Sequence, residues 1–372
     1  MNLKVDKKDL VALLSKTQNI VEKRNTMPIL INILLHAESN ELRVFATDLE
    51  VSLTDQATVK IQSEGKIAVN AKNLFDIVRE LSEGEIALEV KPNNRLQIKQ
   101  NKSVFNIVGI SPEEYPVFPT FKTNDFIEVN PEVLMDMIDR TIYSVSNDET
   151  RYHLNGVYFE KKTENGKTQF RMVATDGHRL SLVDRFTDEN TANIITTGVI
   201  IPRKGLAEVK KIIDFSDMPI QMAVEGSQLI VKTGSTVLMV RLIEGKYPNY
   251  QQLIPNNLKK TASINRESLL SSIRRVSLLS NQKSKGVTIA LANGKMEISS
   301  NNPELGDAKE EIDVDYTGED LKIGFNAKYI LDILNSFQDD KLSLELDTQL
   351  SPGLIRPEND LNYTCVVMPM RI

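Results

Sequence analysis

The chain has 372 residues, an apolar fraction of 41%, a net charge of −6 and one cysteine, Cys365. This length suits several globular domains, the single cysteine excludes a disulfide framework, and the acidic balance argues against simple electrostatic binding of DNA. No apolar run approaches the ~20 residues of a membrane span, and the amino terminus has no long apolar segment, so we expect a cytoplasmic protein without a signal peptide.

Six amphipathic helices are predicted from apolar residues that recur at helical spacing. In chain order they cover residues 7–24, 72–81, 131–143, 203–213, 265–279 and 327–337. In the first helix the face is formed by Leu10, Leu13, Leu14 and Thr17. The third helix has a clear start signal, since proline at position 131 follows a potential capping asparagine.

Short β-branched segments between the helices predict antiparallel strands. Examples are residues 236–244 and 364–372, and the Asn-Gly pairs at 165–166 and 293–294 are typical of tight hairpin turns. Strands in groups, with helices between the groups, favour the α+β class.

The chain is similar to itself at long range. Residues 66–90 and 322–346 align without a gap, nine of the twenty-five positions are identical, and a weaker copy lies at 198–224. Equivalent positions are about 125–135 residues apart, well beyond the ~20–50 residues of a solenoid repeat. We therefore predict three similar α+β domains, each with two helices packed on antiparallel sheets, at 1–122, 123–254 and 255–372.

Charge is unevenly distributed between helices and the rest of the chain. The six helices together carry +6, which leaves −12 elsewhere, although the 131–143 helix is acidic and solvated helix faces of random sign are an alternative interpretation. Six domains of this size, supplied by a head-to-tail dimer, would close into a ring whose hole is about one domain wide, enough for duplex DNA. Basic helices facing that hole would contact phosphates without reading sequence.

Several motifs carry a family resemblance. They are RYHLNGV at 151–157, VATDGHRL at 173–180, IPRKG at 201–205, GKYPNY at 245–250, LLSN at 278–281, NNPE at 301–304 and VVMPMRI at 366–372. In these motifs the chain resembles the bacterial DNA polymerase III beta subunit, the replicative sliding clamp, along its whole length. The resemblance implies a ring-shaped homodimer that encircles DNA, acts as a non-enzymatic processivity factor without cofactors, and is loaded by an ATP-driven clamp loader. It also implies partners such as the polymerase alpha subunit, clamp-loader subunits and other proteins with a clamp-binding motif.

The resemblance further implies a pocket for a short partner peptide between the second and third domains. Carried over position by position, it comprises Leu154, Thr175, Gly177, His178, Arg179, Leu180, Pro248, Ser351, Val366, Met368, Pro369, Met370 and Arg371. The apolar members suit varied partners, and His178, Arg179 and Arg371 are expected to offer hydrogen-bond donors to the peptide. Gln252 and Leu253 depart from the family pattern, which puts the peptide preference in doubt. The alternative is that the last strand only completes a core.

The resemblance and the charge distribution also suggest contacts with DNA and between subunits. The predicted DNA-facing residues are Arg24, Lys204, Lys210, Lys211, Arg274 and Arg275. The predicted dimer interface contains Lys72, Lys102, Phe105, Ile107, Leu278, Leu279 and Glu304, with ion pairs from the two lysines to Glu304 or Glu310. Each basic residue could instead be an ordinary solvated charge, and Val104 stands where the family commonly has a basic residue.

Two other functions stay open at this point. Asp176 and His178 could form part of a catalytic site, although the similar turns at Asp48 and Asn301 favour a role in shaping the backbone. A scaffold that gathers proteins without enclosing DNA is the second alternative. Cys365 lies in an apolar strand and is interpreted as a core residue, and we find no phosphate-binding loop, zinc spacing or other metal site in the sequence.

Overall fold

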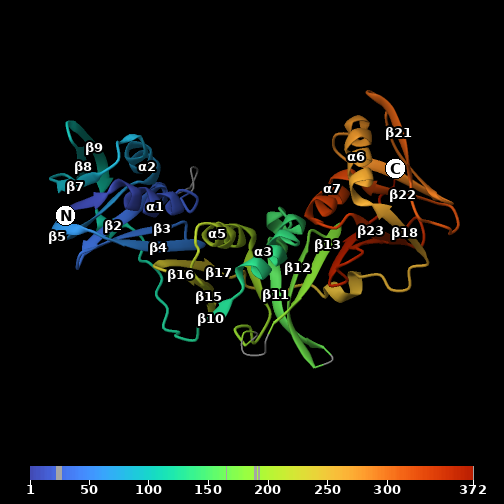
Figure 1. Cartoon of the computed structure of the whole chain (residues 1–372), viewed down its shortest axis with the longest axis horizontal. Helices are drawn as coiled ribbons and strands as arrows, with labels where there is room; N and C mark the ends of the chain where they lie inside the picture. Colours follow the sequence, from blue (N-terminus) through green and yellow to red (C-terminus); the bar gives the residue numbers. More distant parts are fainter. Residues whose placement is uncertain (22–26, 165, 188–190, 192, 372) are drawn as a thin grey trace. The chain divides into compact units, whose positions relative to one another are not determined.

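The structure is a computed structural model that describes residues 1–21, 27–164, 166–187, 191 and 193–371. The chain forms two compact units, one containing Met1–Pro131 and Lys204–Leu242, the other containing Glu132–Arg203 and Ile243–Ile372. Each unit has its own sheets and helices, drawn in Figure 1. No helix in the described ranges is long and apolar enough to cross a bilayer.

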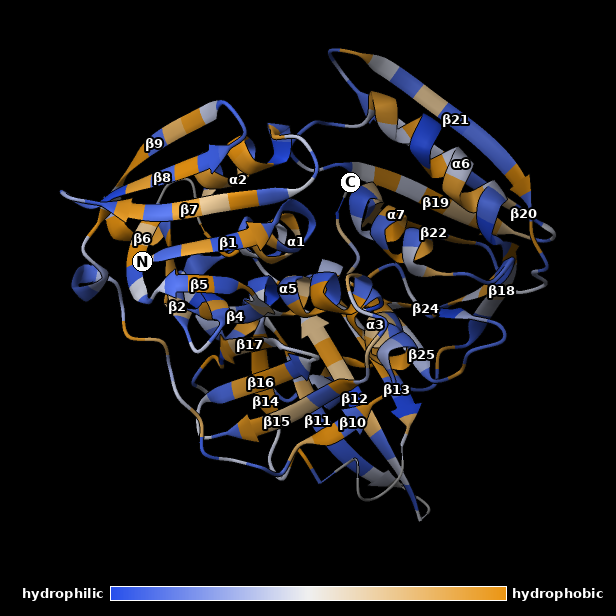
Figure 2. Ribbon diagram, turned by 60° about the vertical axis from the view of Figure 1, so that its left-hand side comes forward, coloured by the Kyte–Doolittle hydropathy of each residue, from blue (hydrophilic) through white to orange (hydrophobic). Residues whose placement is uncertain are grey.

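The first unit contains one antiparallel sheet, in the order β10-β15-β16-β17-β4-β3-β2-β6-β9-β8-β7-β1-β5. The bounds of its strands are β1 Asn2–Asp6, β2 Asn32–Glu38, β3 Glu41–Thr47, β4 Val51–Thr58, β5 Lys60–Ser63, β6 Gly65–Asn70, β7 Glu85–Lys91, β8 Arg95–Gln100, β9 Ser103–Ile110, β10 Ile127–Val129, β15 Ile220–Glu225, β16 Gln228–Thr233 and β17 Thr236–Arg241. Apolar residues alternate with polar ones along many of these strands (Figure 2), so that one face of the sheet is buried.

Helices α1 (Lys7–Thr17), α2 (Ala71–Glu80) and α5 (Arg203–Asp214) belong mainly to this unit. Asp6 caps α1 and Asn70 caps α2, each through a side-chain oxygen that accepts a backbone N–H. The predicted face of α1 is confirmed, since Leu10, Leu13 and Leu14 are buried with Thr17. Helix α1 packs on α2 and on β3 and β4.

The second unit contains an eight-stranded antiparallel sheet, β14-β11-β12-β13-β25-β24-β23-β18, and a four-stranded one, β21-β20-β19-β22. Their bounds are β11 Gly156–Glu164, β12 Lys167–Thr175, β13 Arg179–Phe186, β14 Val199–Pro202, β18 Lys260–Asn265, β19 Gly286–Ala292, β20 Lys295–Asn302, β21 Gly306–Asp313, β22 Leu321–Asn326, β23 Lys341–Leu346, β24 Gly353–Pro357 and β25 Tyr363–Val367. The predicted hairpin at 293–294 is confirmed, because Ala292 pairs with Lys295 and Gly294 has φ of +74°. Asn165 lies outside the described residues.

Helices α3 (Pro131–Asp139), α6 (Arg266–Val276) and α7 (Ala327–Ser336) belong to the second unit. Asn265 caps α6 and Asn326 caps α7, as Asn70 caps α2, which fits the repeat found in the sequence. Helices α6 and α7 pack on each other and on strands of both sheets (Figure 1). Six α-helices thus lie at the predicted places, although α1 ends at Thr17 before the predicted 24 and α3 at Asp139 before the predicted 143, and the α+β prediction is confirmed.

Strand pairing links segments from different predicted domains. Strand β17 pairs with β4 in the first unit, and β13 pairs with β25 in the second. The middle third of the chain is therefore divided between the two units, with β10, β15, β16 and β17 in one and β11 to β14 in the other. The boundaries near 123 and 255 stay a prediction.

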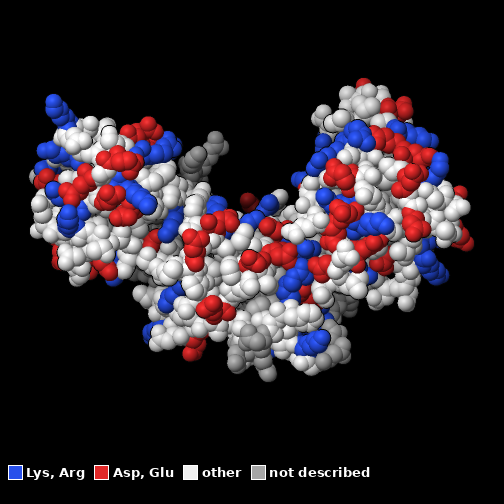
Figure 3. All heavy atoms as spheres, viewed as in Figure 1, with Lys and Arg blue, Asp and Glu red and all other residues white. Residues whose placement is uncertain are grey.

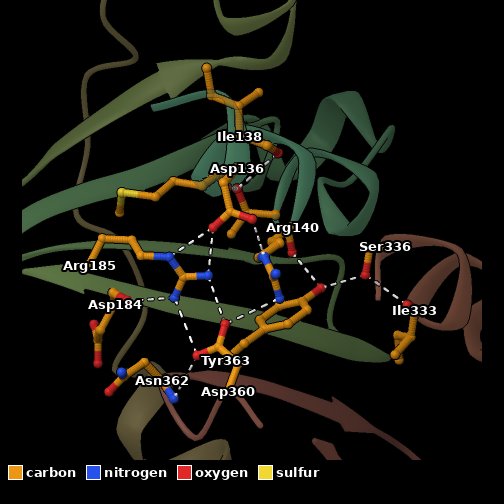
Figure 4. Close-up of polar contacts among 12 residues, drawn as sticks. Asp136, Ile138, Arg140, Asp184, Arg185, Ile333, Ser336, Asp360, Asn362 and Tyr363 are labelled. Atoms are coloured by element: carbon orange, nitrogen blue, oxygen red, sulfur yellow. Dashed lines mark hydrogen bonds and ion pairs between the residues drawn. The ribbon is translucent and has the colours of Figure 1, made fainter. Parts of the chain in front are cut away.

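Two arginines and two aspartates fasten α3 to the strands beneath it in the second unit (Figure 4). Arg185 of β13 donates from Nε to Asp136 of α3 at 2.8 Å and from Nη2 to Asp360 at 2.8 Å. Arg140 donates from Nε to the other oxygen of Asp136 at 2.5 Å and stacks over the ring of Tyr363. The arginine side chains are only 8% and 19% exposed, so each carboxylate compensates charge that has been removed from water.

Beside this network lies a buried cluster of hydroxyl and thiol groups. The hydroxyls of Tyr143 and Tyr363 are 2.8 Å apart, and Cys365 Sγ lies 3.4 Å from the Tyr143 hydroxyl. Ser336 of α7 reaches the Tyr363 hydroxyl at 2.7 Å. Burial raises the pKa of both tyrosines well above the usual value and also raises the pKa of the Cys365 thiol. The interpretation of Cys365 as a core residue is confirmed by its complete burial.

Candidate partner-binding site

The turn from β12 to β13 contains four of the predicted pocket residues. Oδ1 of Asp176 accepts the backbone N–H groups of His178 at 2.9 Å and Arg179 at 3.0 Å. The Thr175 hydroxyl donates to the Arg179 carbonyl at 2.6 Å, and Gly177 has φ of +88°, a conformation that favours glycine. Asp176 therefore shapes its own turn, and its carboxylate is not oriented as a general base for His178.

A side chain that accepts backbone N–H groups of its own turn also occurs in the other two repeats. Asp48 accepts the N–H groups of Glu50 at 2.9 Å and Val51 at 2.6 Å. In the last repeat the prediction of Asn301 was wrong by one residue, because Asn302 is the buried residue that accepts the N–H of Glu304 at 3.0 Å. Asn301 is exposed on the opposite face of β20.

Arg179 has a buried guanidinium, each nitrogen of which donates one hydrogen bond within the chain. It donates from Nε to Asp176 at 3.2 Å and from Nη1 to Asp332 of α7 at 2.6 Å, and Nη2 donates to the Tyr143 carbonyl. Its guanidinium also lies 4.6 Å from the ring centroid of Tyr329. Part of its hydrogen-bonding capacity is therefore used within the chain, and the expectation that Arg179 offers donors to a peptide stays a prediction. Its contacts hold β13 against α7.

An apolar cluster joins three predicted pocket residues, Leu154, Leu180 and Val366. Its other buried members are Val173, Leu182, Ile200, Tyr247 and Tyr250, with Tyr158, Ile243 and Ile254 packed against them. Tyr158 stacks on Tyr247 with ring centroids 5.0 Å apart. Pro248 is half-buried between the two clustered tyrosines of its motif. The tyrosine rings of this cluster form an aromatic surface beside the β12–β13 turn.

The carboxyl-terminal residues extend from this cluster along the second unit. Strand β25 lies between β13 and β24, and the Met368 N–H donates to the His178 carbonyl at 2.8 Å. The Met370 N–H donates to the Gly324 carbonyl at 2.9 Å. Met368 is 40% exposed, Pro369 is half-buried, and Arg371 is exposed. Ser351 lies in the loop after β23, where its hydroxyl contacts that of Thr348.

Sequence reasoning missed several aromatic residues around the site. Tyr247 and Tyr250 flank the predicted Pro248 within one motif, so the motif itself was a sufficient signal. Tyr329 stacks on the His178 ring at 6.4 Å between centroids. The repeat gave a signal for Tyr329, because the earlier copy has Asn73 at the equivalent position and the tyrosine is a difference between two similar helices. The Tyr247 hydroxyl is buried and has no hydrogen-bond partner within the described residues.

Three of the six predicted DNA-facing residues lie next to acidic side chains of their own unit. Lys204 pairs with Asp48, Lys211 lies 2.7 Å from Glu208, and Arg275 makes two hydrogen bonds to Glu310. Arg274 is exposed and donates to Asn335 at 3.0 Å. Arg24 lies outside the described residues. Basic and acidic side chains are interleaved on the face of each unit seen in Figure 3, as these pairs require.

The predicted interface residues lie on or beside two sheet edges. Phe105 is 39% exposed and Ile107 half-buried on β9, whose ladder with β6 involves only Gly109 and Ile110. Leu278 is 76% exposed and Leu279 half-buried near β21, which pairs only with β20. Lys102 and Glu304 are exposed.

Two residues of the ion pairs predicted across the interface also have partners within the chain, and the intersubunit pairs stay a prediction. Lys72 Nζ lies 2.5 Å from Asp76, and Glu310 is held by Arg275. Among the described residues no group of three or more His, Cys, Asp or Glu side chains is arranged to hold a metal ion.

Comparison with known proteins agrees with this arrangement along the whole chain. Family models of the DNA polymerase III beta subunit match in order, with the N-terminal domain at residues 1–119, the central domain at 128–249 and the C-terminal domain at 251–371. The chain is 34% identical over 374 residues to the beta sliding clamp of Caulobacter vibrioides and 30% identical over 374 residues to that of Escherichia coli K12, each pair covered completely.

A solved structure of the Caulobacter crescentus beta sliding clamp matches with a TM-score of 0.94 at 34% identity, covering 100% of both chains. The Pseudomonas aeruginosa DNA polymerase III subunit beta matches with a TM-score of 0.92 at 30% identity, again over 100% of both chains. The chain therefore belongs to the DNA polymerase III beta subunit family, the bacterial sliding clamps.

Proposed function

We propose that this chain is a processivity factor that encircles duplex DNA as a head-to-tail homodimer and tethers the replicative polymerase. The observation that carries the proposal is the match of all three beta-subunit domains, in order and over the full chain. The family is that of an accessory subunit, so the protein has no catalytic site of its own. Asp176 accepts two backbone N–H groups of its own turn, which agrees with a structural role for this carboxylate.

The ring needs six similar domains, which two copies of a three-domain chain supply. We propose domains at 1–122, 123–254 and 255–372, each contributing a pair of helices. The exposed edge of β9 would meet β21 of the next subunit, with Phe105 and Ile107 against Leu278 and Leu279. Lys72, Lys102 and Glu304 would lie at its rim, where ion pairs add specificity more than affinity.

Contact with DNA is proposed for Lys204, Lys210, Lys211, Arg274 and Arg275, together with Arg24. Several of these side chains already have a carboxylate partner, which weakens the attraction for phosphate. Weak contact suits a protein that slides, because a closed ring stays on DNA through topology and not through affinity. The proposed location is the cytoplasm, where the chromosome is replicated.

Partner proteins are proposed to dock at the site formed by the β12–β13 turn, the apolar cluster and the carboxyl-terminal residues. The exposed Met368 and the tyrosine rings of the apolar cluster suit an apolar side chain of the peptide. The polymerase alpha subunit, clamp-loader subunits and other proteins with the same short motif would compete for it.

The decisive experiment compares DNA topologies. The protein is loaded by a clamp loader and ATP onto nicked circular plasmid, half of which is then linearised, and bound protein is separated by gel filtration. A ring is retained on the circle and lost from the free ends of the linear form. Equal retention on both forms would contradict encirclement and favour a surface binder.

A further inference from the structure

Beside the carboxyl-terminal residues the second unit has an open hollow of about 560 Å³. It is lined by Thr288, Lys322, Ile323, Gly324, Gln349, Leu350, Met370 and Arg371. Of these only Met370 and Arg371 were expected from the sequence to contact a partner. The residues added by the structure come from β19, β22 and the loop that follows β23.

The alternation of β22 explains why a hollow forms here. Ile323 and Phe325 are buried, so Lys322 and Gly324 lie on the opposite, outer face of the strand. Thr288 of β19 is directly opposite Gly324 and shares that face. Gly324 has no side chain, so the outer surface of the sheet is indented at this position. The Met370 N–H donates to the Gly324 carbonyl and holds the carboxyl-terminal segment beside it.

The charge of the hollow differs from that of the surrounding surface. Lys322 and Arg371 are exposed, and neither forms an ion pair within the described part of the chain. Arg275, in the same unit, is by contrast neutralised by Glu310. The chain as a whole carries −6. Two uncompensated cations at one hollow on an acidic protein select an anionic ligand.

The other lining residues indicate what kind of anion. Leu350 is 66% exposed, and the half-buried Met370 adds apolar surface. The phosphates of a nucleic-acid backbone do not cover such residues, whereas a peptide that alternates acidic and apolar side chains offers a partner to both the cations and the apolar surface. The hollow is also continuous with the docking site, since Met368 is bonded to His178 and Met370 to Gly324.

We propose that this hollow is an extension of the partner site that binds an acidic stretch flanking the docking motif of partner proteins. The inference rests on the proposed function, because the same partner peptide occupies both places. Lys322 and Arg371 attract the acidic side chains, and Leu350 covers apolar atoms between them. Partners with acidic flanks thereby compete better than partners with neutral ones.

The test uses fluorescein-labelled peptides from the clamp-binding segment of the same bacterium's polymerase alpha subunit. The segment is made alone and with three glutamates or three serines added at either end. Binding is measured by fluorescence polarisation with the full-length protein, with K322E, and with K283E. Lys283 is an exposed lysine of the same unit outside the hollow, so K283E changes the net charge equally.

With the unmodified protein, one glutamate-extended peptide is expected to bind about fivefold more tightly than its serine counterpart, as two exposed ion pairs allow. The gain should disappear in K322E, persist in K283E and shrink as salt is raised. Equal affinity for glutamate and serine peptides, with the core segment still bound, would overturn the extension alone. Failure of every peptide to bind would overturn the docking site and the extension together.

Nucleic acid is the competing occupant and is tested directly. A single-stranded thymidine oligonucleotide is titrated against the bound glutamate-extended peptide at constant salt. The proposal expects no displacement that depends on Lys322. Displacement that is lost in K322E and kept in K283E would assign the hollow to nucleic acid and contradict the proposal.

Discussion

Arg179 on β13 and Asp332 on α7 are 153 residues apart in the chain, yet their side chains are joined at 2.6 Å. Arg179 is 7% exposed and Asp332 28%. The guanidinium also lies between the rings of Tyr143 and Tyr329, and the Tyr329 ring supports His178. One ion pair therefore holds a strand of the predicted central domain to a helix of the predicted third domain, directly beside the proposed partner site.

Replacing Asp332 with asparagine should loosen this connection. The variant keeps the side-chain shape but leaves a buried guanidinium without one charge partner, so the free energy of unfolding should fall by about 1–3 kcal/mol. Peptide affinity should fall as well, because Tyr329 and His178 lose their fixed positions. Urea unfolding and fluorescence polarisation measure the two effects. D320N, at an exposed aspartate, is the matched control, and equal behaviour of the two variants would contradict the role of Asp332.

Replacing Asp360 with asparagine tests the network of Figure 4. Arg140 and Arg185 would then share only Asp136, and the loss of one partner of a buried pair should cost about 2–4 kcal/mol of unfolding free energy. E319Q, which removes the pair between Glu319 and Lys260 at the surface, should lower the unfolding free energy far less than D360N does. Chemical unfolding at low and high salt gives both values. A similar small effect for both variants would show that the network does not contribute.

Stability should decrease at high pH because of the cluster around Cys365. The raised pKa values mean that the thiol and the Tyr143 and Tyr363 hydroxyls keep their protons when folded, while the unfolded chain loses them above pH 9 to 10. The unfolded state then binds fewer protons, so the free energy of unfolding falls as pH rises, by about 1.4 kcal/mol per pH unit for each group. Below about pH 8 these groups should have no effect.

The variant C365A isolates the thiol. Between pH 9 and 10 its stability should fall less steeply than that of the unmodified protein, by up to about 1.4 kcal/mol per pH unit. Urea unfolding at half-unit pH steps measures the slope. Parallel curves for the two proteins would mean that Cys365 ionises equally in both states.

Reversing the charge of Lys210 and Lys211 should weaken loading onto DNA without changing peptide affinity. If both contact phosphate, the slope of log affinity against log salt should become shallower by about 2. Lys211 neighbours Glu208, so the glutamine pair K210Q and K211Q is measured beside the glutamate pair to separate lost attraction from new repulsion. Unchanged loading in both variants removes these lysines from the DNA-facing set.

Deleting residues 368–372 should abolish peptide binding and leave the dimer intact. Met368 supplies exposed apolar atoms, and the backbone N–H groups of Met368 and Met370 bond to His178 and Gly324, whereas the proposed interface uses β9 and β21. Light scattering gives the mass and fluorescence polarisation the affinity. Loss of the dimer together with peptide binding would contradict the assignment of the site.

Much of the fold could be predicted because its elements are local and repeated. Asn70, Asn265 and Asn326 each cap a helix through a side-chain oxygen that accepts a backbone N–H, and apolar spacing located six α-helices of the described chain. The pairings of β17 with β4 and β13 with β25 could not be predicted, since the partner of an edge strand depends on which surfaces meet and not on the strand's own sequence.

The candidate site was predictable in part for similar reasons. Motif positions gave the β12–β13 turn and the last strand, but not how each charge is used. Arg179 was expected to offer donors to a peptide, and the sequence gave no sign that it also donates to Asp176, Asp332 and Tyr143. Tyr329 differs from Asn73 at the equivalent position of the earlier copy, but that difference does not tell which side chain the tyrosine contacts. Side-chain partners from distant segments are set by tertiary geometry, which residue spacing does not encode.

The burial of Cys365 has a practical consequence for following ring opening. It is the only cysteine in the chain, it is free, and it is 0% exposed, and a protonated, inaccessible thiol reacts slowly with maleimides. A cysteine introduced at Leu278 or Val108 could therefore carry a fluorophore without prior removal of the native thiol. Energy transfer between two such dyes across the proposed subunit junction would report when each individual ring opens.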